Sequence, residues 1–248
     1  MEEHIKIRVK FEKSGALRFI GHLDVMRFFQ KCNRRAGIDI CYTGGFSPHQ
    51  IMSFASPLSV GHESKGEYMD LEVSSVTNSV DMIRRYNEAS VPELKIISVK
   101  RLPKEAGNAM ASVRAASYEV RFREDRVPSI FLTDAVNSAI QIFLSKDDIP
   151  FRKEGKSGER FVNLRPGIFA FSWDKDKKAC SMLLDASSAG NIKPIQVLET
   201  FLSDQGDSLR ENSFMVTRID LFTDSGEGTN FISLDEVGEN ILWIKMGN

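Results

Sequence analysis

Cysteine is scarce in this 248-residue sequence, and the spacings that mark common cofactor sites are absent. The three cysteines, Cys32, Cys41 and Cys180, form no CxxC pair, which argues against a zinc-finger site and a disulfide framework. A reducing compartment is therefore expected. Neither GxGxxG nor GxxxxGKS/T occurs, so the usual dinucleotide and phosphate-loop motifs are excluded as well.

The sequence also lacks a long apolar run. A transmembrane helix needs about 20 consecutive apolar residues, and no segment approaches that length. The first 13 residues alternate charged and apolar side chains and contain no apolar core of the kind that a signal peptide needs. We therefore expect a soluble, cytoplasmic protein with no membrane partner.

Net charge is close to neutral, at −1, but the charges are unevenly distributed along the chain. Residues 1–50 contain nine lysines and arginines against five acidic residues. Residues 224–248 contain one lysine against five acidic residues. The basic start of the chain suits an anionic partner such as nucleic acid, and the acidic end suits another protein.

The apolar pattern predicts the element order β-α-β-β-α-β twice. In the first half, a two-residue alternation predicts a strand over 4–11, and a 3.6-residue period predicts a helix over 22–36. The other elements expected in this half are extended segments at 17–20 and 38–42, strands at 66–73 and 94–99, and a helix over 78–87. The second half is expected to contain strands at 118–122, 160–172, 179–184 and 214–222, with helices at 130–144 and 192–203.

This order is that of the ferredoxin-like fold, in which four antiparallel strands carry both helices on one face. The predicted class is α+β, with two tandem ferredoxin-like units of antiparallel sheets and a C-terminal strand extension. Residues 103–108 are typical of a linker, so we expect an N-terminal domain over 1–103 and a C-terminal domain over 104–248. The acidic tail is expected to add strands at 231–234 and 241–246.

Basic side chains recur on one face of the predicted helix 22–36. They are Arg27, Lys31, Arg34 and Arg35, with Arg18 just before the helix. Such a cluster can bind phosphate groups through charge and paired hydrogen bonds. The same pattern is also typical of a solvated outer face on which Asp24 pairs with Arg27.

A long irregular loop over 43–54 carries two glycines and a proline. Gly44 and Gly45 permit a positive φ or a close approach to a ligand, and Pro48 stiffens the second half of the loop. A loop of this length in a small domain favours a functional role. We expect it to grip a phosphate or a substrate through Gly45, Ser47, His49 and Ser53. The alternative is a structural crossover in which His49 caps backbone groups.

Three aromatic residues lie near these segments in the sequence, namely Phe19, Tyr42 and Phe46. They can stack on bases, as in RNA-binding sheets, or belong to the core. The sheet lacks the aromatic-glycine signature of the RNA-recognition module.

A metal site is the next candidate. His22, His49 and Cys41 with Glu63 or Glu67 would provide suitable ligand types for zinc or iron. No HxH, HExxH or CxxC spacing supports such a site. We therefore expect no metal and no cofactor.

Several motifs in the first 70 residues resemble those of a bacterial family. They are RFIGHLD at 18–24, RRAG at 34–37, GFSPH at 45–49, SF at 53–54 and GHESKGEY at 61–68, with NLRP at 163–166 as a weaker match. The set resembles the radical SAM-linked proteins, a domain of unknown function found beside, or fused to the C-terminus of, a cobalamin-type radical SAM protein. The resemblance implies a radical SAM protein as partner. Genes of that family tend to neighbour ribonuclease and ribosomal-protein genes, so the resemblance also implies an RNA setting by association. Because CxxxCxxC is absent, this chain is not expected to hold the iron–sulfur cluster itself.

These observations support one leading hypothesis and two alternatives. The leading hypothesis is a non-catalytic accessory module that binds RNA, or an RNA-linked substrate, for a radical SAM enzyme. The first alternative is a small RNA-processing hydrolase, because tandem ferredoxin-like folds are similar to the CRISPR repeat-processing endoribonucleases. His22 or His49 would then be the general acid/base, with Arg34 and Ser53 near the scissile phosphate. The second alternative is a purely protein-binding partner.

Overall fold

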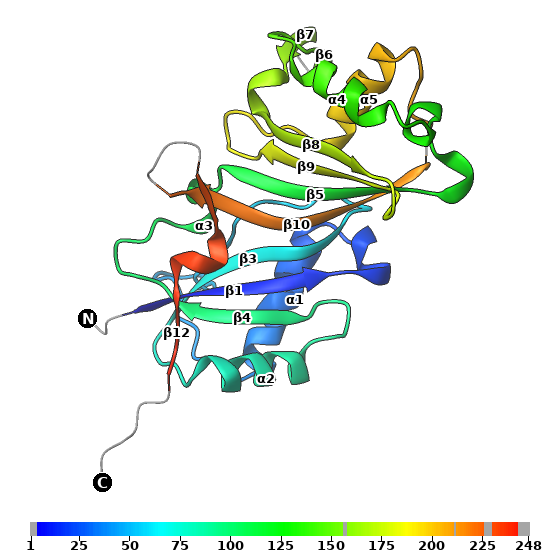
Figure 1. Ribbon diagram of the computed structural model, residues 1–248. Helices are drawn as coiled ribbons and strands as arrows, with labels where there is room; N and C mark the ends of the chain where they lie inside the picture. The colour runs from blue at the N-terminus through cyan, green and yellow to red at the C-terminus, as the bar shows by residue number, and fades with distance from the viewer. Residues whose placement is uncertain (1–3, 156–157, 211, 226–229, 243–248) are drawn as a thin grey trace. The chain divides into compact units, whose positions relative to one another are not determined.

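The computed structural model describes residues 4–155, 158–210, 212–225 and 230–242, and it has an α+β architecture. The chain divides into two compact units. Unit 1 comprises Met1–Arg114 and Asp220–Asn248, and unit 2 comprises Ala115–Ile219. The chain leaves unit 1 after residue 114 and returns to it within strand β10 (Phe214–Asp224). Figure 1 follows this path by colour.

Unit 1 contains an antiparallel sheet and two main helices. Its elements up to residue 114 are β1 (Ile5–Lys13), α1 (His22–Arg35), β2 (Met52–Phe54), β3 (Glu63–Val73), α2 (Ser79–Ala89), β4 (Ile96–Arg101) and the short α3 (Ala109–Ser112). The strands lie in the order β4-β1-β3, and β2 pairs with β3. The helices predicted at 22–36 and 78–87 and the strands predicted at 4–11, 66–73 and 94–99 are confirmed to within a few residues.

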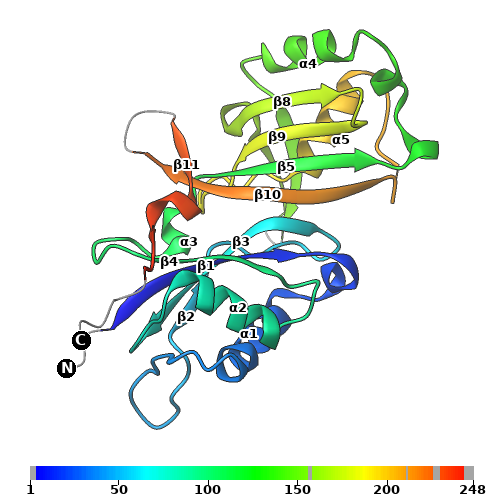
Figure 2. The same cartoon turned by 60° about the horizontal axis from the view of Figure 1, so that its bottom comes forward.

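The core of unit 1 lies between the sheet and the two helices. Alternate side chains of β1, including Val9 and Phe11, are buried against them. Phe11 contacts Phe29 of α1, with ring centroids 4.7 Å apart. Figure 2 shows α1 and α2 covering the same face of the sheet. The opposite alternation, including Arg8 and Lys10, therefore points to the other face, which we call the helix-free face.

The prediction of an extended segment at 17–20 is wrong. Residues 17–19 belong to a 3₁₀ helix, η1 (Gly15–Phe19), and Ile20 is the residue that follows it. Gly15 takes φ +58°, which turns the chain out of β1, and the N–H of Ile20 bonds back to the carbonyl of Leu17 at 3.1 Å. A glycine at the end of a strand pattern thus introduced a tight turn that the apolar residues after it did not indicate.

The prediction of a strand at 38–42 is also wrong. This segment makes two isolated bridges, Ile40 to Val73 and Tyr42 to Gln50. β2 pairs with Met69, Asp70 and Leu71 of β3. The segment 38–42 therefore reaches only the last position of β3, at Val73. The strand that pairs with β3 here is β2 (Met52–Phe54), which the sequence pattern assigned to the irregular loop.

Unit 2 also combines a sheet with helices. Its elements are β5 (Ala115–Phe122), α4 (Val136–Leu144), β6 (Pro150–Gly155), β7 (Gly158–Asn163), β8 (Ile168–Asp174), β9 (Ala179–Asp185), α5 (Pro194–Asp204) and the first part of β10. The main sheet has the order β10-β5-β9-β8, and β6 and β7 form a separate hairpin. The strands predicted at 118–122, 179–184 and 214–222 and the helix at 192–203 are confirmed.

Two predicted elements of unit 2 are broken in the structure. The helix predicted over 130–144 is a 3₁₀ turn, Ser129–Leu132, followed by α4. The strand predicted over 160–172 is split into β7 and β8 by a second 3₁₀ turn, Arg165–Gly167, which contains Pro166. Proline lacks the N–H that a strand ladder requires, so the interruption has a local cause.

The tail packs on the helix-free face of unit 1. It consists of β11 (Phe231–Ser233), the 3₁₀ turn η5 (Leu234–Val237) and β12 (Glu239–Asn240). β11 pairs with the end of β10, and β12 pairs with β4. The strand predicted at 231–234 is confirmed by β11. Most of the strand predicted at 241–246 lies outside the described residues.

Candidate nucleic-acid interface

Helix α1 displays basic side chains to solvent. Its buried side includes Val25 and Phe29. Its first turn carries Asp24, and a carboxylate at this position interacts favourably with the unpaired N–H groups of the helix N-terminus. The helix ends where Gly37 takes φ +60°, a conformation that suits glycine after a helix. The four basic residues predicted for the outer face are all exposed, namely Arg27, Lys31, Arg34 and Arg35.

These four side chains differ in their partners. Arg27 forms an ion pair with Asp24 at 3.3 Å on the exposed surface. Arg35 donates two hydrogen bonds to the carbonyl of Ala89, at 3.2 and 2.9 Å, and so connects α1 to the end of α2. Within the described part of the chain, the side chains of Lys31 and Arg34 make no hydrogen bond and no ion pair. Their charge is therefore available to a ligand.

The loop that follows α1 is attached to this helix by Gln50. The side chain of Gln50 is 4% exposed, accepts a hydrogen bond from Asn33 Nδ2 at 2.9 Å and donates one to the carbonyl of Gln30 at 2.9 Å. Gln30 and Arg34 are one helical turn apart on α1. The base of the loop thus lies on the side of α1 that carries Arg34. Figure 2 shows the loop projecting from unit 1 beside α1.

The loop closes through contacts between Thr43 and His49. The N–H of His49 donates to Thr43 Oγ1 at 3.2 Å, and the imidazole Nδ1 lies 3.1 Å from the same oxygen. Gly45 takes φ +95°, so this position favours glycine. Phe46 is fully exposed, at 111%, and Ser47 and His49 are exposed as well. The loop therefore presents an aromatic ring, a hydroxyl and an imidazole to solvent.

Two of the predicted site residues lie elsewhere. Ser53 stands opposite Asp70 in the β2–β3 ladder, which places it on the helix-free face, across the sheet from α1. Arg18 lies in η1, before the start of α1, and pairs with Glu63 at 3.2 Å. Arg34 is near the other end of α1, roughly 18 Å along the helix. Arg18 and Ser53 therefore stand apart from Arg34 and the loop.

His22 also stands apart from the loop. It is the first residue of α1, and its ring packs edge-on against Phe54, with centroids 5.1 Å apart. It lines a cavity of about 20 Å³ together with the buried side chains of Lys13 and Glu67. A cavity of this volume holds about one water molecule.

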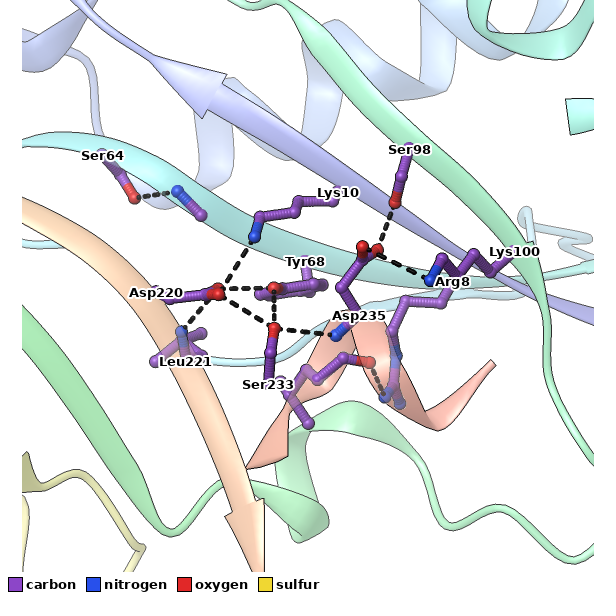
Figure 3. Close-up of polar contacts among 12 residues, drawn as sticks. Arg8, Lys10, Ser64, Tyr68, Ser98, Lys100, Asp220, Leu221, Ser233 and Asp235 are labelled. Atoms are coloured by element: carbon purple, nitrogen blue, oxygen red, sulfur yellow. Dashed lines mark hydrogen bonds and ion pairs between the residues drawn. The ribbon is translucent and has the colours of Figure 1, made fainter. Parts of the chain in front are cut away.

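A buried polar network on the helix-free face is the main feature that the sequence interpretation missed. Asp220 accepts hydrogen bonds from Lys10 at 3.0 Å, from Ser233 at 2.8 Å and from Tyr68 at 2.5 Å, as Figure 3 shows. Burial raises the pKa of the Tyr68 phenol, and the charge of Asp220 raises it further. The network therefore favours a protonated Tyr68.

The same face holds a second buried ion pair. Arg8, 1% exposed, donates to both carboxylate oxygens of Asp70, at 2.8 and 2.9 Å, and to the carbonyl of Leu234 at 3.1 Å. Asp235 accepts from Ser98 and pairs with Lys100. These contacts fix the tail to the sheet. The only sequence signal for them is the alternation of Arg8 and Lys10 in β1, which does not identify their partners.

Neither a metal centre nor a membrane-spanning helix is found in the part of the chain that the structure describes. No group of three or more histidine, cysteine, aspartate or glutamate side chains there is arranged to hold a metal ion. No helix there combines the length and the apolar character needed to cross a bilayer.

Comparison with known proteins identifies the family. No curated protein matches the sequence. One family model does match, described as "Uncharacterized protein conserved in bacteria (DUF2344)", and it covers residues 6–194. The matched region runs from β1 to the start of α5 and includes α1 and its loop. Because this is well over half of the chain, the protein belongs to the DUF2344 family of uncharacterized bacterial proteins.

Proposed function

We propose that this protein is an accessory module that binds RNA, or an RNA-linked substrate, through unit 1. The binding surface, which we call the α1 interface, consists of Lys31 and Arg34 of α1 together with the loop residues Phe46, Ser47 and His49. The protein has no catalytic activity of its own in this proposal. It presents its ligand to a radical SAM enzyme.

The observation that carries the proposal is a pair of exposed cations, Lys31 and Arg34, which have no side-chain partner among the described residues and lie on the helix to which the loop is attached. Lys31 and Arg34 keep their charge exposed, whereas nearby Arg35 is used to connect two helices. An arginine guanidinium can bind a phosphate through two hydrogen bonds. Phe46, fully exposed in the loop that Gln50 attaches to α1, offers a flat face on which an unpaired base can stack. Phosphate and base contacts together are what single-stranded RNA requires.

We also infer that each unit is ferredoxin-like. Unit 1 has the chain order β1-α1-β2-β3-α2-β4 and the strand order β4-β1-β3-β2. Unit 2 has the order β5-α4-β8-β9-α5-β10, interrupted by the β6–β7 hairpin, and the strand order β10-β5-β9-β8. The same permutation in both units supports a tandem arrangement. The radical SAM partner is proposed from the resemblance of the motifs at 18–24, 34–37, 45–49 and 61–68.

A salt titration of RNA binding tests the proposal. The full chain is titrated into a fluorescein-labelled single-stranded RNA of mixed sequence, and the anisotropy is followed at several salt concentrations. For single strands, the slope of log K against log salt changes by about 0.7 for each phosphate contact. We expect Lys31→Ala and Arg34→Ala each to weaken binding and to reduce this slope by about 0.7.

Arg84→Ala provides the matched control. Arg84 is an exposed arginine on α2, but it already pairs with Asp81 at 2.7 Å and with Glu88 at 2.9 Å. Its removal should leave both the affinity and the salt slope unchanged. If Arg84→Ala weakens binding as much as Arg34→Ala does, the interaction is not located at α1 and the assignment of the site fails.

The remaining outcomes decide between the alternatives. Cleavage of the RNA without added metal, lost in His22→Ala or His49→Ala, would overturn the non-catalytic proposal in favour of a hydrolase. Absence of any RNA affinity at low salt would overturn both and favour a protein-binding role.

A further inference from the structure

A basic cavity lies at one end of the unit 1 sheet, away from α1. It has a volume of about 400 Å³, and it is lined by His4, Ile5, Lys6, Arg101, Leu102 and Lys104. Four of these six residues are basic, and none of the described lining residues carries a carboxylate. Figure 1 shows why they meet: the start of β1 lies beside the end of β4. The hydrogen bond from the N–H of Leu102 to the carbonyl of Lys6, at 2.9 Å, extends this pairing.

The cations of this cavity are only partly neutralised. Across the described residues, the side chains of Lys6 and Arg101 make no ion pair and no hydrogen bond. His4 contacts Glu72 through Nδ1 at 2.8 Å. Glu72 stands opposite Lys6 in the β1–β3 ladder, and Glu239 stands opposite Arg101 in the β4–β12 ladder. Two unpartnered cations in a concave site attract a compact anion, and arginine can hold a phosphate with two hydrogen bonds.

A second cavity adjoins the first and has a different character. It has a volume of about 370 Å³ and shares Lys6 and Leu102 with the basic cavity. Its polar lining is mostly acceptor groups, from Ser53, Asp70, Glu72 and Asn108, beside apolar Ile51 and Met52. Volumes of this size fall in the range of roughly 300–1,000 Å³ that small-molecule sites occupy.

One carboxylate that lines the second cavity, that of Asp70, is already bonded to the protein. Asp70 is held by both hydrogen bonds from Arg8, and its Oδ2 also accepts from the N–H of Ala109 at 2.7 Å. Its carboxylate is therefore engaged by the protein. Glu72 contacts His4 through Oε2, so its other carboxylate oxygen and the hydroxyl of Ser53 remain as acceptors for hydroxyl groups of a ligand.

The geometry points to a binding site for a small phosphate monoester that carries a hydroxyl-rich body, such as a nucleoside 5′-monophosphate. The phosphate lies in the basic cavity against Lys6 and Arg101. The hydroxyl-bearing part lies in the adjoining cavity, where acceptors meet its hydroxyl donors and Ile51 and Met52 contact its apolar side. The division of charge orients the ligand, because the acidic side of the cleft repels the phosphate. The site shares no residue with the α1 interface, so it does not depend on the proposed RNA binding.

Isothermal titration calorimetry on the full chain tests this site. The probes are adenosine 5′-monophosphate, ribose 5-phosphate, inorganic phosphate and adenosine. We expect adenosine 5′-monophosphate to bind most tightly, inorganic phosphate more weakly, and adenosine without measurable affinity. Lys6→Gln and Arg101→Gln should each weaken binding of the monophosphate by about tenfold or more, since each removes a charge-assisted hydrogen bond.

Lys65→Gln is the matched control. Lys65 is an exposed lysine of β3 that lines neither cavity, so its variant should bind as the unaltered protein does. Ribose 5-phosphate binding as tightly as adenosine 5′-monophosphate would support the site and narrow its ligand to a sugar phosphate. Three results would each overturn the inference. They are equal binding of adenosine and its monophosphate, unchanged binding of the monophosphate in both Lys6→Gln and Arg101→Gln, and no binding of any probe at millimolar concentration.

Discussion

At the scale of single residues, the most consequential contact is the buried pair of Arg8 and Asp70. Their side chains are 2% and 12% exposed. Removing one charge of a buried pair leaves the other without compensation. We expect Asp70→Asn to lower the free energy of unfolding by roughly 3–5 kcal/mol, measured by urea denaturation.

A surface pair gives the comparison for this prediction. Asp24 and Arg27 are 60% and 67% exposed and lie 3.3 Å apart. Solvent screens such a pair, so Asp24→Asn should change the free energy of unfolding by less than about 1 kcal/mol, including the loss of a carboxylate near the helix N-terminus. If Asp70→Asn and Asp24→Asn lower the free energy of unfolding by similar amounts, the burial of Arg8 does not determine how much its ion pair contributes to stability.

Arg8 also shows why part of the site chemistry could not be predicted. Its position in the alternation of β1 places it on the face opposite Val9, and the sequence supports that much. Its partners Asp70 and Leu234 lie 62 and 226 positions further along the chain. A periodic pattern reports which face a side chain occupies and carries no information on what covers that face.

At the scale of elements, the end of α1 depends on a glycine conformation. Gly37 takes φ +60°, and a Cβ there would lie 2.9 Å from Arg85 Nη2. A residue with a side chain in this left-handed conformation costs about 1–2 kcal/mol. We therefore expect Gly37→Ala to lower the free energy of unfolding by about that amount in urea denaturation.

Gly44, seven positions on, is the control for Gly37. No atom lies within 4 Å of a Cβ built at Gly44, and its φ is outside the left-handed region. Gly44→Ala should be neutral, or stabilising by up to about 1 kcal/mol, because it restricts the unfolded chain. A loss in Gly44→Ala that matches that of Gly37→Ala would contradict the assignment of strain to φ.

The elements that sequence patterns predicted well are those with a local cause. α2 begins after Asn78, whose side chain accepts from the N–H of Asp81 at 2.9 Å, so its start is encoded within four residues. The segment 38–42 has an equally apolar pattern but pairs only at single positions, because β2 takes the edge of β3. Competition between two segments for one strand edge is a tertiary effect, and propensity does not resolve it.

At the scale of the whole molecule, the charge asymmetry of the sequence does not translate directly into surface charge. The tail is acidic in sequence, yet Asp235 pairs with Lys100 inside unit 1. Lys10 of the basic segment is likewise paired with Asp220. A charge from each end of the chain is thus paired within unit 1. The α1 interface therefore depends on Lys31 and Arg34 and not on the net charge of residues 1–50.

Alkaline pH should destabilise the folded protein because its buried tyrosine phenols and a buried cysteine thiol keep their protons in the folded state. Burial raises the pKa of Tyr68 and Tyr86 in unit 1 and that of Cys180 in unit 2. Above the unfolded tyrosine pKa of about 10, the unfolded chain loses these protons while the folded chain keeps them. The unfolded state then binds fewer protons, so stability falls as pH rises, by up to about 1.4 kcal/mol per pH unit for each tyrosine.

Tyr68→Phe isolates one of these contributions. At pH 8 the variant loses the hydrogen bond to Asp220, which should lower the free energy of unfolding by about 1–3 kcal/mol. Between pH 10 and 11 the stability of the variant should fall less steeply than that of the unaltered protein, because one titrating phenol is gone. The two slopes should differ by up to about 1.4 kcal/mol per pH unit. Urea denaturation followed by circular dichroism at each pH should therefore give two curves that converge. Parallel curves would mean that the Tyr68 phenol has the same pKa in the folded and unfolded chains. Asp220 would then not raise the pKa of Tyr68.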